Sequence, residues 1–526
     1  MRFFFIILHI KTKLLHCLCN KSIKCPFYSL MNETEKKDSY THVLKYTGIF
    51  GGVQGLNIIM GLVRNKLIAL LLGPAGMGLA SLFNTTINFI SQATNFGISF
   101  SAVKHLSEIA DSGDEARIRH FVKVIRIWSF ITALLGMLVC MAVGPLLSDY
   151  TFSWGDHTLH FVLLSPAVGM LAVTGGETAI LKALRRLRAL ASIQIYMVFA
   201  ALLVSVPIYY FFGESGIVPV IVLVTFLSMT FTIYYSWRVC PLRLGGLTGV
   251  LGEGMAMVRL GVAFVFAGIL GSGAEMVIRS YLNVSGGLGV VGLYNAGFML
   301  TVTYAGMVFS SMETDYFPRL SAVNHETAAV NITVNRQIEV SLLLLSPMLV
   351  MLMVALPVLM PLLFRSDFMP IVPMAQVAVF SMYLKAMSLP ISYITLAKGD
   401  SAAYLVLEVV YDILFVLLII VFYDWWGLFG TGIAISLSYL LDLLLVYMYA
   451  RIRYRYVVSL QVLAYAGIQL LLGCIAYSAT FAGRSIVYWL TGICMCIAST
   501  AVSLHVLRKK TSLWDALLKK LNHRHG

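Results

Sequence analysis

The chain has 526 residues, of which 59% are hydrophobic and only 12% are charged, whereas soluble domains carry about 25% charged residues. This composition excludes a water-soluble fold. The net charge of +14 does not indicate nucleic acid binding, because the Lys and Arg residues lie in short connectors between apolar runs rather than on one soluble face. We therefore expect an all-α polytopic membrane protein.

The first 43 residues are predicted to form an N-terminal cytoplasmic segment. Its opening part, residues 1–30, holds one apolar stretch of about eight residues, which is too short to span a membrane. No small-residue cleavage site of a signal peptide follows this stretch. Met31 opens a polar segment typical of a cytoplasmic start, so we expect translation to begin at Met31 and residues 1–30 to be absent from the protein.

Hydropathy, with Gly, Pro and charge clusters as breaks, predicts about 14 membrane-spanning helices. Each apolar run has roughly 20 to 27 residues, enough to cross a hydrocarbon core of about 30 Å. In chain order the predicted spans cover 46–72, 77–100, 126–147, 158–181, 190–211, 216–236, 260–282, 289–312, 338–361, 373–397, 402–423, 427–449, 458–480 and 485–506.

The distribution of basic residues predicts the topology. After Met31, the connectors assigned to the outside contain only Arg365 and Arg484, and every other connector Lys or Arg falls on the cytoplasmic side. Such a bias favours an even number of spans with both termini in the cytoplasm. A last segment, 508–526, is predicted to be a cytoplasmic tail that lies on the membrane surface, because its leucines form one stripe opposite its lysines.

A weak internal repeat divides the spans into lobes. Arg64 is followed by glycines in a pattern similar to the one that follows Arg279, with small differences in spacing. Transporters built from repeats show such correspondence between their halves. We therefore expect an N-terminal six-helix lobe at 44–240, a C-terminal six-helix lobe at 255–456, and two additional helices in 457–507.

Four basic residues are predicted to lie within spans, and they are the candidate substrate-binding residues: Arg64, Lys66, Arg279 and Lys385. A cation near the bilayer centre costs about 2.5 to 3.5 kcal/mol, so such side chains should line a wet cavity and bind an anion. Snorkelling to the headgroups is the competing explanation for the first three. Lys385 is about 18 Å from either end of its span, which an extended Lys cannot comfortably cover, so the cavity explanation is favoured there.

Acidic residues within the spans are candidates for ion coupling or internal pairing. Glu275 stands four residues before Arg279 on one helical face, so these two form either an ion pair or part of a transport site. Glu408 and Asp412 are also four residues apart, and one of them could bind a coupling H⁺ or Na⁺, or pair with a neighbouring span. The remaining acidic residues in spans are Glu177 and Asp442.

Signatures of enzymes and of ATP-driven pumps do not occur in the sequence. There is no GxxxxGK[ST] phosphate loop, and the external connectors are too short for a catalytic domain. The eight Cys residues indicate neither disulfides nor zinc. We expect no cofactor, no metal and no catalytic residue, and a cycle driven by an ion gradient or by consumption of the product on the far side.

Several segments carry a family resemblance over most of residues 44–450. They are GPAGMGL at 73–79, VKHL at 103–106, VGLYN at 291–295, YFPRLS at 316–321, LK at 384–385 and AK at 397–398. These motifs resemble the Wzx flippases of O-antigen and enterobacterial common antigen, in the superfamily that includes MATE drug exporters and the lipid II flippase. The motifs are moderately specific, and they determine the fold better than the cargo.

The resemblance implies a V-shaped two-lobe fold that works by alternating access, and it places Arg64 where the lipid II flippase has a cavity arginine. It implies a flippase that moves a lipid-linked oligosaccharide, on undecaprenyl diphosphate, across a bacterial inner membrane. Guanidinium and ammonium groups suit a diphosphate. Membrane lipids, a polysaccharide polymerase and chain-length proteins are the expected partners.

Two other functions stay open. A MATE-like ion-coupled exporter of cationic drugs would need acidic residues to dominate the cavity, whereas the sequence places comparable numbers of cations and acids within the spans. A membrane polymerase or ligase would need a large external loop with catalytic side chains, and the external connectors are too short for one. The identity of the glycan and of the coupling ion stay open as well.

Overall fold

The structure, a computed structural model, describes residues 33–111, 113–151, 157–241, 250–303, 306, 309, 316–317, 319–483 and 485–510. The predictions for residues 1–30 and for the amphipathic tail beyond Lys510 lie outside these residues. The chain divides into two compact units, Met1–Gly55 and Leu56–Gly526. In the first unit, the described residues from Glu33 onward are helical. The second unit contains the helix bundle and the candidate site.

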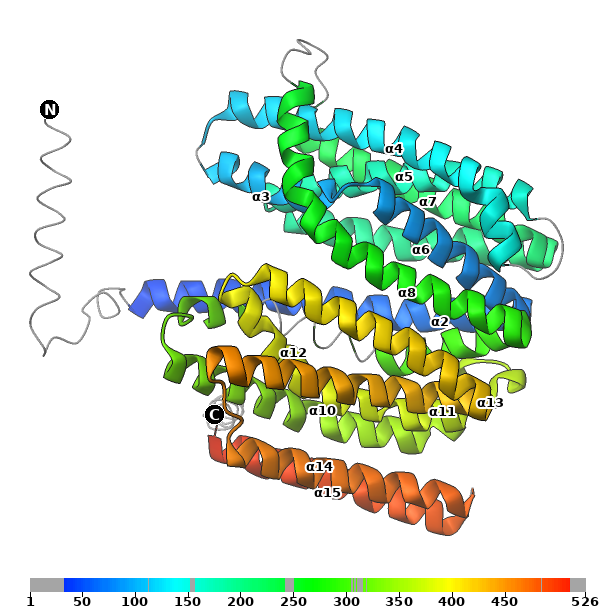
Figure 1. The fold of residues 1–526 in the computed structure, drawn as a ribbon, viewed down its shortest axis with the longest axis vertical. Helices are drawn as coiled ribbons and strands as arrows, with labels where there is room; N and C mark the ends of the chain where they lie inside the picture. Colours follow the sequence, from blue (N-terminus) through cyan, green and yellow to red (C-terminus); the bar gives the residue numbers. More distant parts are fainter. Residues whose placement is uncertain are drawn as a thin grey trace, which may run out of the picture. The chain divides into compact units, whose positions relative to one another are not determined.

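Within the described residues the protein is helical throughout and contains no strand (Figure 1). The α-helices are α2 (Glu33–Thr94), α3 (Ile98–Asp111), α4 (Glu115–Thr151), α5 (Thr158–Ala183), α6 (Leu187–Phe212), α7 (Ile217–Val239), α8 (Val250–Phe298), α10 (Thr327–Leu363), α11 (Ile371–Ala378), α12 (Phe380–Ala397), α13 (Ser401–Tyr454), α14 (Leu460–Ser478) and α15 (Ile486–Lys510). Short helical turns are η2 (Gly213–Gly216), η3 (Met299–Thr303), η4 (Ser366–Phe368) and η5 (Ala479–Ala482).

Ten helical stretches of the described residues are long and apolar enough to cross a membrane. Four of them contain a break: Gly73 in α2, η2 between α6 and α7, Gly287 in α8, and Trp426 with Gly427 in α13. Counting each broken stretch as two spans makes the structure consistent with the 14 predicted helices. The all-α membrane fold expected from composition is confirmed.

Contacts across the breaks show that the chain folds back. Tyr411 and Tyr439 of α13 have ring centroids 5.6 Å apart, although 28 intervening steps of a straight helix would separate them by about 42 Å. Tyr196 of α6 stacks on Phe231 of α7 with centroids 6.1 Å apart. These long stretches are therefore antiparallel helix pairs, each suited to the thickness of one bilayer.

The helices contact one another in two groups. The first contains α3 to α7, and the second contains α10 to α13 with most of α8. The beginning of α8 also contacts α3 and α4 of the first group. The lobe boundaries predicted from the sequence, 44–240 and 255–456, remain a proposal.

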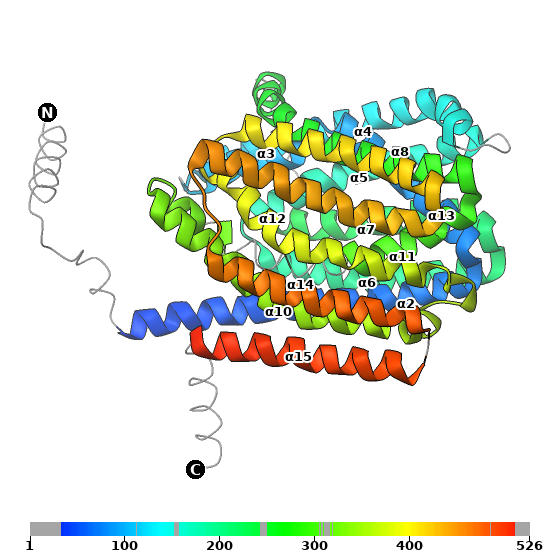
Figure 2. The ribbon, with the colours of Figure 1, turned by 60° about the horizontal axis from the view of Figure 1, so that its bottom comes forward.

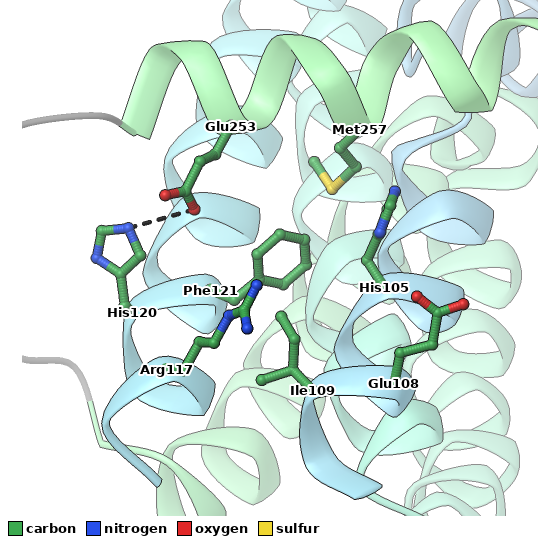
Figure 3. Close-up of a pocket in the computed structure, with 8 residues that line it drawn as sticks. All are labelled: His105, Glu108, Ile109, Arg117, His120, Phe121, Glu253 and Met257. Atoms are coloured by element: carbon green, nitrogen blue, oxygen red, sulfur yellow. Dashed lines mark ion pairs between the residues drawn. The ribbon is translucent and has the colours of Figure 1, made fainter. Parts of the chain in front are cut away.

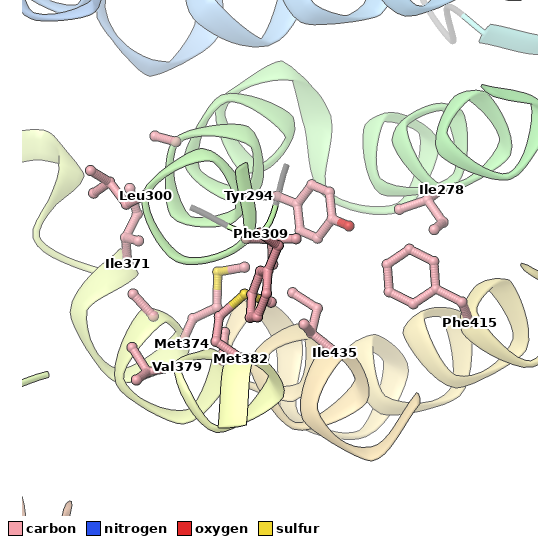
Figure 4. Packing of buried hydrophobic residues seen from close by; sticks show 14 of the residues in the cluster. Ile278, Tyr294, Leu300, Phe309, Ile371, Met374, Val379, Met382, Phe415 and Ile435 are labelled. Carbon is pink, nitrogen blue, oxygen red and sulfur yellow. The ribbon is translucent and has the colours of Figure 1, made fainter. Parts of the chain in front are cut away.

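The apolar core of the second group is formed by side chains from α8, η3 and α10 to α13. Figure 4 shows Phe309 in this cluster with Met374, Met382 and Ile435. Met374 and Met382 are fully buried, and their unbranched side chains fill the irregular space between crossing helices. This core holds α12 rigidly, which fixes the position of Lys385.

The last two helices, α14 and α15, lie side by side against α10 (Figure 2). A buried amide joins them, since Gln469 of α14 donates to Ser503 Oγ at 3.0 Å and accepts from Ser499 Oγ at 2.6 Å. Interhelical hydrogen bonds of this kind stabilise helix pairs in lipid, where water cannot replace them.

Candidate functional site

The second half of α2 crosses the second half of α8 at two glycines. A side-chain carbon at Gly78 would overlap the carbonyl oxygen of Leu288, and one at Gly292 would overlap the carbonyl oxygen of Pro74. In both cases the opposite glycine nitrogen would lie 3.0 Å away. The two backbones therefore touch directly, as small residues permit between membrane helices.

This crossing is two-fold symmetric in sequence. Pro74 and Leu288, and likewise Gly78 and Gly292, are related by the same offset along the chain. The same offset relates the break residues Gly73 and Gly287, both of which have positive φ, a conformation that glycine adopts at little cost. The glycines of the internal repeat are therefore equivalent at this crossing, but Arg64 is not the equivalent of Arg279, because the same offset pairs Arg279 with Asn65.

Beside the crossing, Arg279 joins α8 to α2. Its guanidinium donates to Ser81 Oγ at 3.0 Å and to Asn295 Oδ1 at 3.3 Å, and it pairs with Glu275 Oε2 at 3.0 Å. The Arg279 side chain is only 8% exposed, whereas that of Glu275 is 47% exposed. The ion pair considered from the i,i+4 spacing is therefore present, and Glu275 keeps an open side.

Lys385 lies at the centre of the second group of helices. Its Nζ is 5.8 Å from the ring centroid of Phe309 and 5.6 Å from that of Tyr439, within the range of cation–π attraction. The carboxylates of Glu408 and Asp442 lie close enough to interact with it electrostatically. The ammonium thus has both aromatic and acidic neighbours deep in a predicted span.

The acidic side chains connect these two centres. Asp412 interacts electrostatically with both Glu408 and Glu275, and Asp442 hydrogen-bonds Ser388 on α12. A continuous series of charged groups runs from Arg279 at the lobe crossing, through the acids of α8 and α13, to Lys385 on α12. We call Arg279, Glu275, Asp412, Glu408, Lys385 and Asp442 the charged network.

Carboxylates outnumber cations in this network, since it contains four acids and two bases. Four charged acids grouped so closely would repel one another, so such a group favours uptake of a proton or a metal cation. The sequence places comparable numbers of cations and acids within the spans, but in this network the balance is acidic.

Arg64 and Lys66 lie elsewhere on α2. Arg64 is exposed and acts electrostatically on Tyr209 of α6, and Lys66 is half-buried. Among the described residues, no hydrogen bond or ion pair joins either cation to the charged network. The structure therefore brings Arg279, Lys385 and the three predicted acids together, and it places Arg64 next to the first group of helices.

A separate pocket of about 430 Å³ lies between α3, α4 and the start of α8 (Figure 3). His120 Nε2 on α4 is 3.3 Å from Glu253 Oε2 on α8, and Phe121 forms part of the wall. Nearby, Trp128 Nε1 donates to the carbonyl of Val250 at 3.2 Å. The pocket marks a second contact between the two groups of helices, at the other end from Gly78.

No group of three His, Cys, Asp or Glu side chains that could hold a metal ion occurs among the described residues. A further buried ion pair, Arg126 with Glu177 at 2.8 Å, links α4 to α5. The Trp237 indole also donates to this carboxylate, at 3.3 Å. Because every partner belongs to the first group of helices, this pair stabilises the packing there.

Comparison with known families identifies the chain. The sequence model of the family described as "Polysaccharide biosynthesis protein" matches residues 59–373, more than half of the length. The chain belongs to this family of polysaccharide biosynthesis proteins. Comparison with curated protein sequences finds no match.

Solved structures share the fold of this polysaccharide biosynthesis protein at low sequence identity. The lipid II flippase MurJ is 12% identical with a TM-score of 0.66, covering 88% of this chain and 99% of MurJ. A multidrug resistance MATE transporter of the MOP superfamily is 13% identical with a TM-score of 0.65, covering 76% of this chain and 94% of that one. A MOP superfamily transporter from Pyrococcus furiosus has 14% identity and a TM-score of 0.55, covering 78% and 94%.

These likenesses establish the fold. The fold expected from the resemblance noted in the sequence is confirmed, and the family match confirms the link to polysaccharide biosynthesis.

Some site residues of this polysaccharide biosynthesis protein are not predictable from the sequence. Ser81, Phe309 and Tyr439 carry no charge, so nothing in the sequence separates them from ordinary helix-packing residues. Asp442 is recognisable as an acid within a span, but the sequence does not assign it to the site. Asn295 lies in the VGLYN motif at 291–295, which is the available signal.

Proposed function

We propose that this membrane protein is a flippase that moves an oligosaccharide linked to undecaprenyl diphosphate from the cytoplasmic to the periplasmic leaflet of a bacterial inner membrane. Its family membership and its MOP-type fold support a transporter in polysaccharide synthesis. The neighbour MurJ is named as a lipid II flippase, so a protein of the same fold takes a lipid as its cargo. By this proposal both termini are cytoplasmic, and a polysaccharide polymerase with chain-length proteins acts on the product.

The observation that carries the proposal is the pair of cations at depth, Arg279 and Lys385. Each costs about 2.5 to 3.5 kcal/mol in lipid when unsupported, and Lys385 is about 18 Å from the nearer end of its span, too far to reach the headgroups. Guanidinium gives paired hydrogen bonds to phosphate oxygens, and ammonium supplies a movable charge. Together with Arg64 and Lys66, they are our candidates for binding the diphosphate.

Alternating access requires that the lobes part at one end at a time. The backbone contact of Gly78 with Gly292 closes the end that the Lys and Arg distribution assigns to the periplasm. At the opposite end, the His120–Glu253 contact joins α8 to α4. Because both contacts are formed together in this structure, we propose that the lobes part by release of one contact at a time while the other is kept.

Glu275, Glu408 and Asp412 are our candidates for the coupling site. Glu275 neutralises Arg279 and also faces Asp412, so a phosphate that binds Arg279 would release the carboxylate to bind H⁺ or Na⁺. Binding of the anion and of the coupling cation would then favour each other.

A MATE-like ion-coupled exporter of small molecules is the second candidate. The excess of carboxylates in the charged network favours it, because acids attract cationic drugs. The two candidates differ in the sign of the cargo, so one experiment separates them.

The experiment is deletion of the gene followed by lipid extraction and complementation. We expect lipid-linked repeat units to accumulate on the cytoplasmic side, and to be cleared by the wild-type gene but not by Lys385→Ala or Arg64→Ala variants present at normal membrane levels. Unchanged lipid pools together with new drug sensitivity would favour the exporter. Normal surface glycan in either variant would remove that cation from the transport site.

A further inference from the structure

A basic pocket lies apart from the charged network, where three helix ends meet. The start of α10, the turn between α12 and α13, and the end of α13 enclose about 630 Å³. Its lining residues are Thr327, Lys398, Gly399, Asp400, Arg453, Tyr454 and Arg455. This volume is within the range of small-molecule sites in proteins.

The floor of the pocket is a fixed carboxylate. Asp400 accepts hydrogen bonds from Tyr449 at 2.9 Å, from Tyr454 at 2.8 Å and from the amide of Ala403 at 3.2 Å. These bonds, that of Tyr454 first, lower the pKa of Asp400 below its ordinary value, so it is ionised at neutral pH. Its acceptor capacity is largely used by the two tyrosines and the amide, and it ties the start of α13 to the end.

Three cations surround this floor. The Lys398 ammonium donates to the carbonyl of Asn324, which fixes its direction. Arg453 and Arg455 are exposed, and within the described part of the chain no hydrogen bond or ion pair holds either guanidinium. With Asp400 counted, the lining carries a net charge of +2 at neutral pH, so it attracts anions.

Backbone geometry adds to this preference. No side chain caps the N-terminus of α10, whose N-cap residue Glu326 is exposed and does not line the pocket. Free amide groups and the helix dipole at such an end favour an anion, phosphate above all. At the end of α13, Arg455 has a φ of 56° and the next amide, that of Tyr456, donates to the carbonyl of Ala450 at 3.2 Å, so the chain turns sharply and keeps the Arg455 side chain at the rim.

The surface next to the arginines is strongly apolar. Ile452 is 79% exposed, Val457 is 53% exposed and Leu460 is 85% exposed. In a membrane-spanning bundle these side chains face the bilayer, so a phosphate group held in the pocket could belong to a lipid whose acyl chains lie against them. A basic pocket beside a lipid-facing surface at the cytoplasmic side is the arrangement that holds phosphate headgroups.

We propose that this pocket binds the phosphate headgroup of an anionic phospholipid in the cytoplasmic leaflet, with Arg453 and Arg455 holding the phosphate at the uncapped start of α10. The acyl chains of the lipid would cover the exposed side chains of Ile452, Val457 and Leu460 beside the pocket. The site does not depend on the flippase proposal, since it shares no residue with the charged network.

The test is lipid binding by the full-length purified protein, measured by native mass spectrometry. Phosphatidylglycerol and phosphatidylcholine with identical acyl chains are titrated separately. We expect phosphatidylglycerol to bind the parent protein more tightly than phosphatidylcholine does. Each cation near the membrane surface contributes about fivefold to the affinity for an anionic lipid. The affinity for phosphatidylglycerol should therefore fall about fivefold in Arg453→Gln and about 25-fold in the double variant Arg453→Gln with Arg455→Asn. Asparagine is used at position 455 because it tolerates the left-handed backbone.

Arg451→Gln is the matched control. Arg451 lies on the same helix end, is exposed, and donates to Tyr447 Oη at 2.8 Å without lining the pocket. The Arg451→Gln substitution should leave phosphatidylglycerol binding unchanged. Equal binding of the two lipids, an equal loss in the control, or unchanged binding by Arg453→Gln would each overturn the proposal.

Two competitors identify the source of the phosphate. If inorganic phosphate at millimolar concentration displaces phosphatidylglycerol completely, the pocket is a site for a soluble anion and the lipid assignment is wrong. The second competitor is undecaprenyl phosphate. If the protein binds undecaprenyl phosphate more tightly than phosphatidylglycerol, so that a lower concentration occupies the pocket, the site belongs to the carrier lipid instead. Persistence of phosphatidylglycerol against both supports the proposal, whatever the outcome of the transport experiment.

Discussion

Replacing Gly292 by alanine adds one methyl carbon where the backbones of α2 and α8 touch. That carbon would overlap the carbonyl oxygen of Pro74, with the carbonyl carbon 2.7 Å away and the amide nitrogen of Gly78 3.0 Å away. Non-bonded heavy atoms are most stable at about 3.5 to 4.0 Å, and the new carbon would lie far inside that distance from the Pro74 oxygen, so the helices would have to separate by about 1.5 to 2 Å. Backbone atoms have no rotamer with which to move aside.

Overpacking of this kind costs about 1 to 3 kcal/mol. Because the strain exists only while the two lobes touch at this end, it should shift the equilibrium toward separated lobes by about 5- to 150-fold. Gly289→Ala is the control on the same helix, since a side-chain carbon there has nothing within 4 Å.

The assay is a spin-label distance measurement between Leu70→Cys and Val284→Cys. These two side chains are 46% and 55% exposed and are related by the same offset as the glycines, so the labels report on equivalent positions just before the breaks of α2 and α8. We expect a longer distance population in Gly292→Ala that is absent from the parent and from Gly289→Ala. An unchanged distribution in a folded Gly292→Ala protein, or the same change in the control, would falsify this account of the crossing.

Three further outcomes are expected. Arg126→Gln should lower the free energy of unfolding by about 3 to 5 kcal/mol, because it leaves the Glu177 carboxylate buried without its partner. Thermal unfolding in detergent measures this loss, and an unchanged unfolding midpoint would contradict it. Gln469→Ala should cost about 1 to 2 kcal/mol by removing the hydrogen bonds between α14 and α15, seen as easier proteolysis of that pair with transport retained. Asp412→Asn should make export insensitive to an imposed proton or sodium gradient in vesicles, and an unaltered gradient response would remove this residue from the coupling site.

The fold was predictable because composition and hydropathy act over long stretches. The break residues were predictable as well, since Gly73 and Gly287 lie between predicted spans and Gly427 begins one. The helix α3 was missed, because residues 101–111 looked like part of a cytoplasmic loop. Ile98, Ala102 and Leu106, all fully buried, are four residues apart, and this spacing was the overlooked signal of an amphipathic helix.

The site was predictable only where charge conflicts with an apolar surrounding. Lys385 and Arg279 were found in this way, because an isolated charge in lipid is costly. The neighbours that Lys385 has in space, Phe309 and Tyr439, come from distant parts of the chain, and hydropathy contains no information about such pairing. Arg64 shows the limit of this reasoning. It is a charged residue inside a predicted span, but its side chain lies beside the first group of helices and not in the charged network.

The symmetry of the crossing indicates which lobe carries the charged chemistry. By the offset that relates Gly78 to Gly292, Asn65 on α2 is the equivalent of Arg279, and Ser81 is the equivalent of Asn295. Arg279 therefore donates to two equivalent positions, one on α2 and one on α8.

If α2 also carried an arginine at position 65, two cations would meet across one backbone contact and repel each other. An Asn65→Arg variant should thus weaken the crossing, and Asn65→Arg with Arg279→Asn should restore it. Failure of the second change to reduce the label distance between positions 70 and 284 would show that the lobes are not interchangeable at this point.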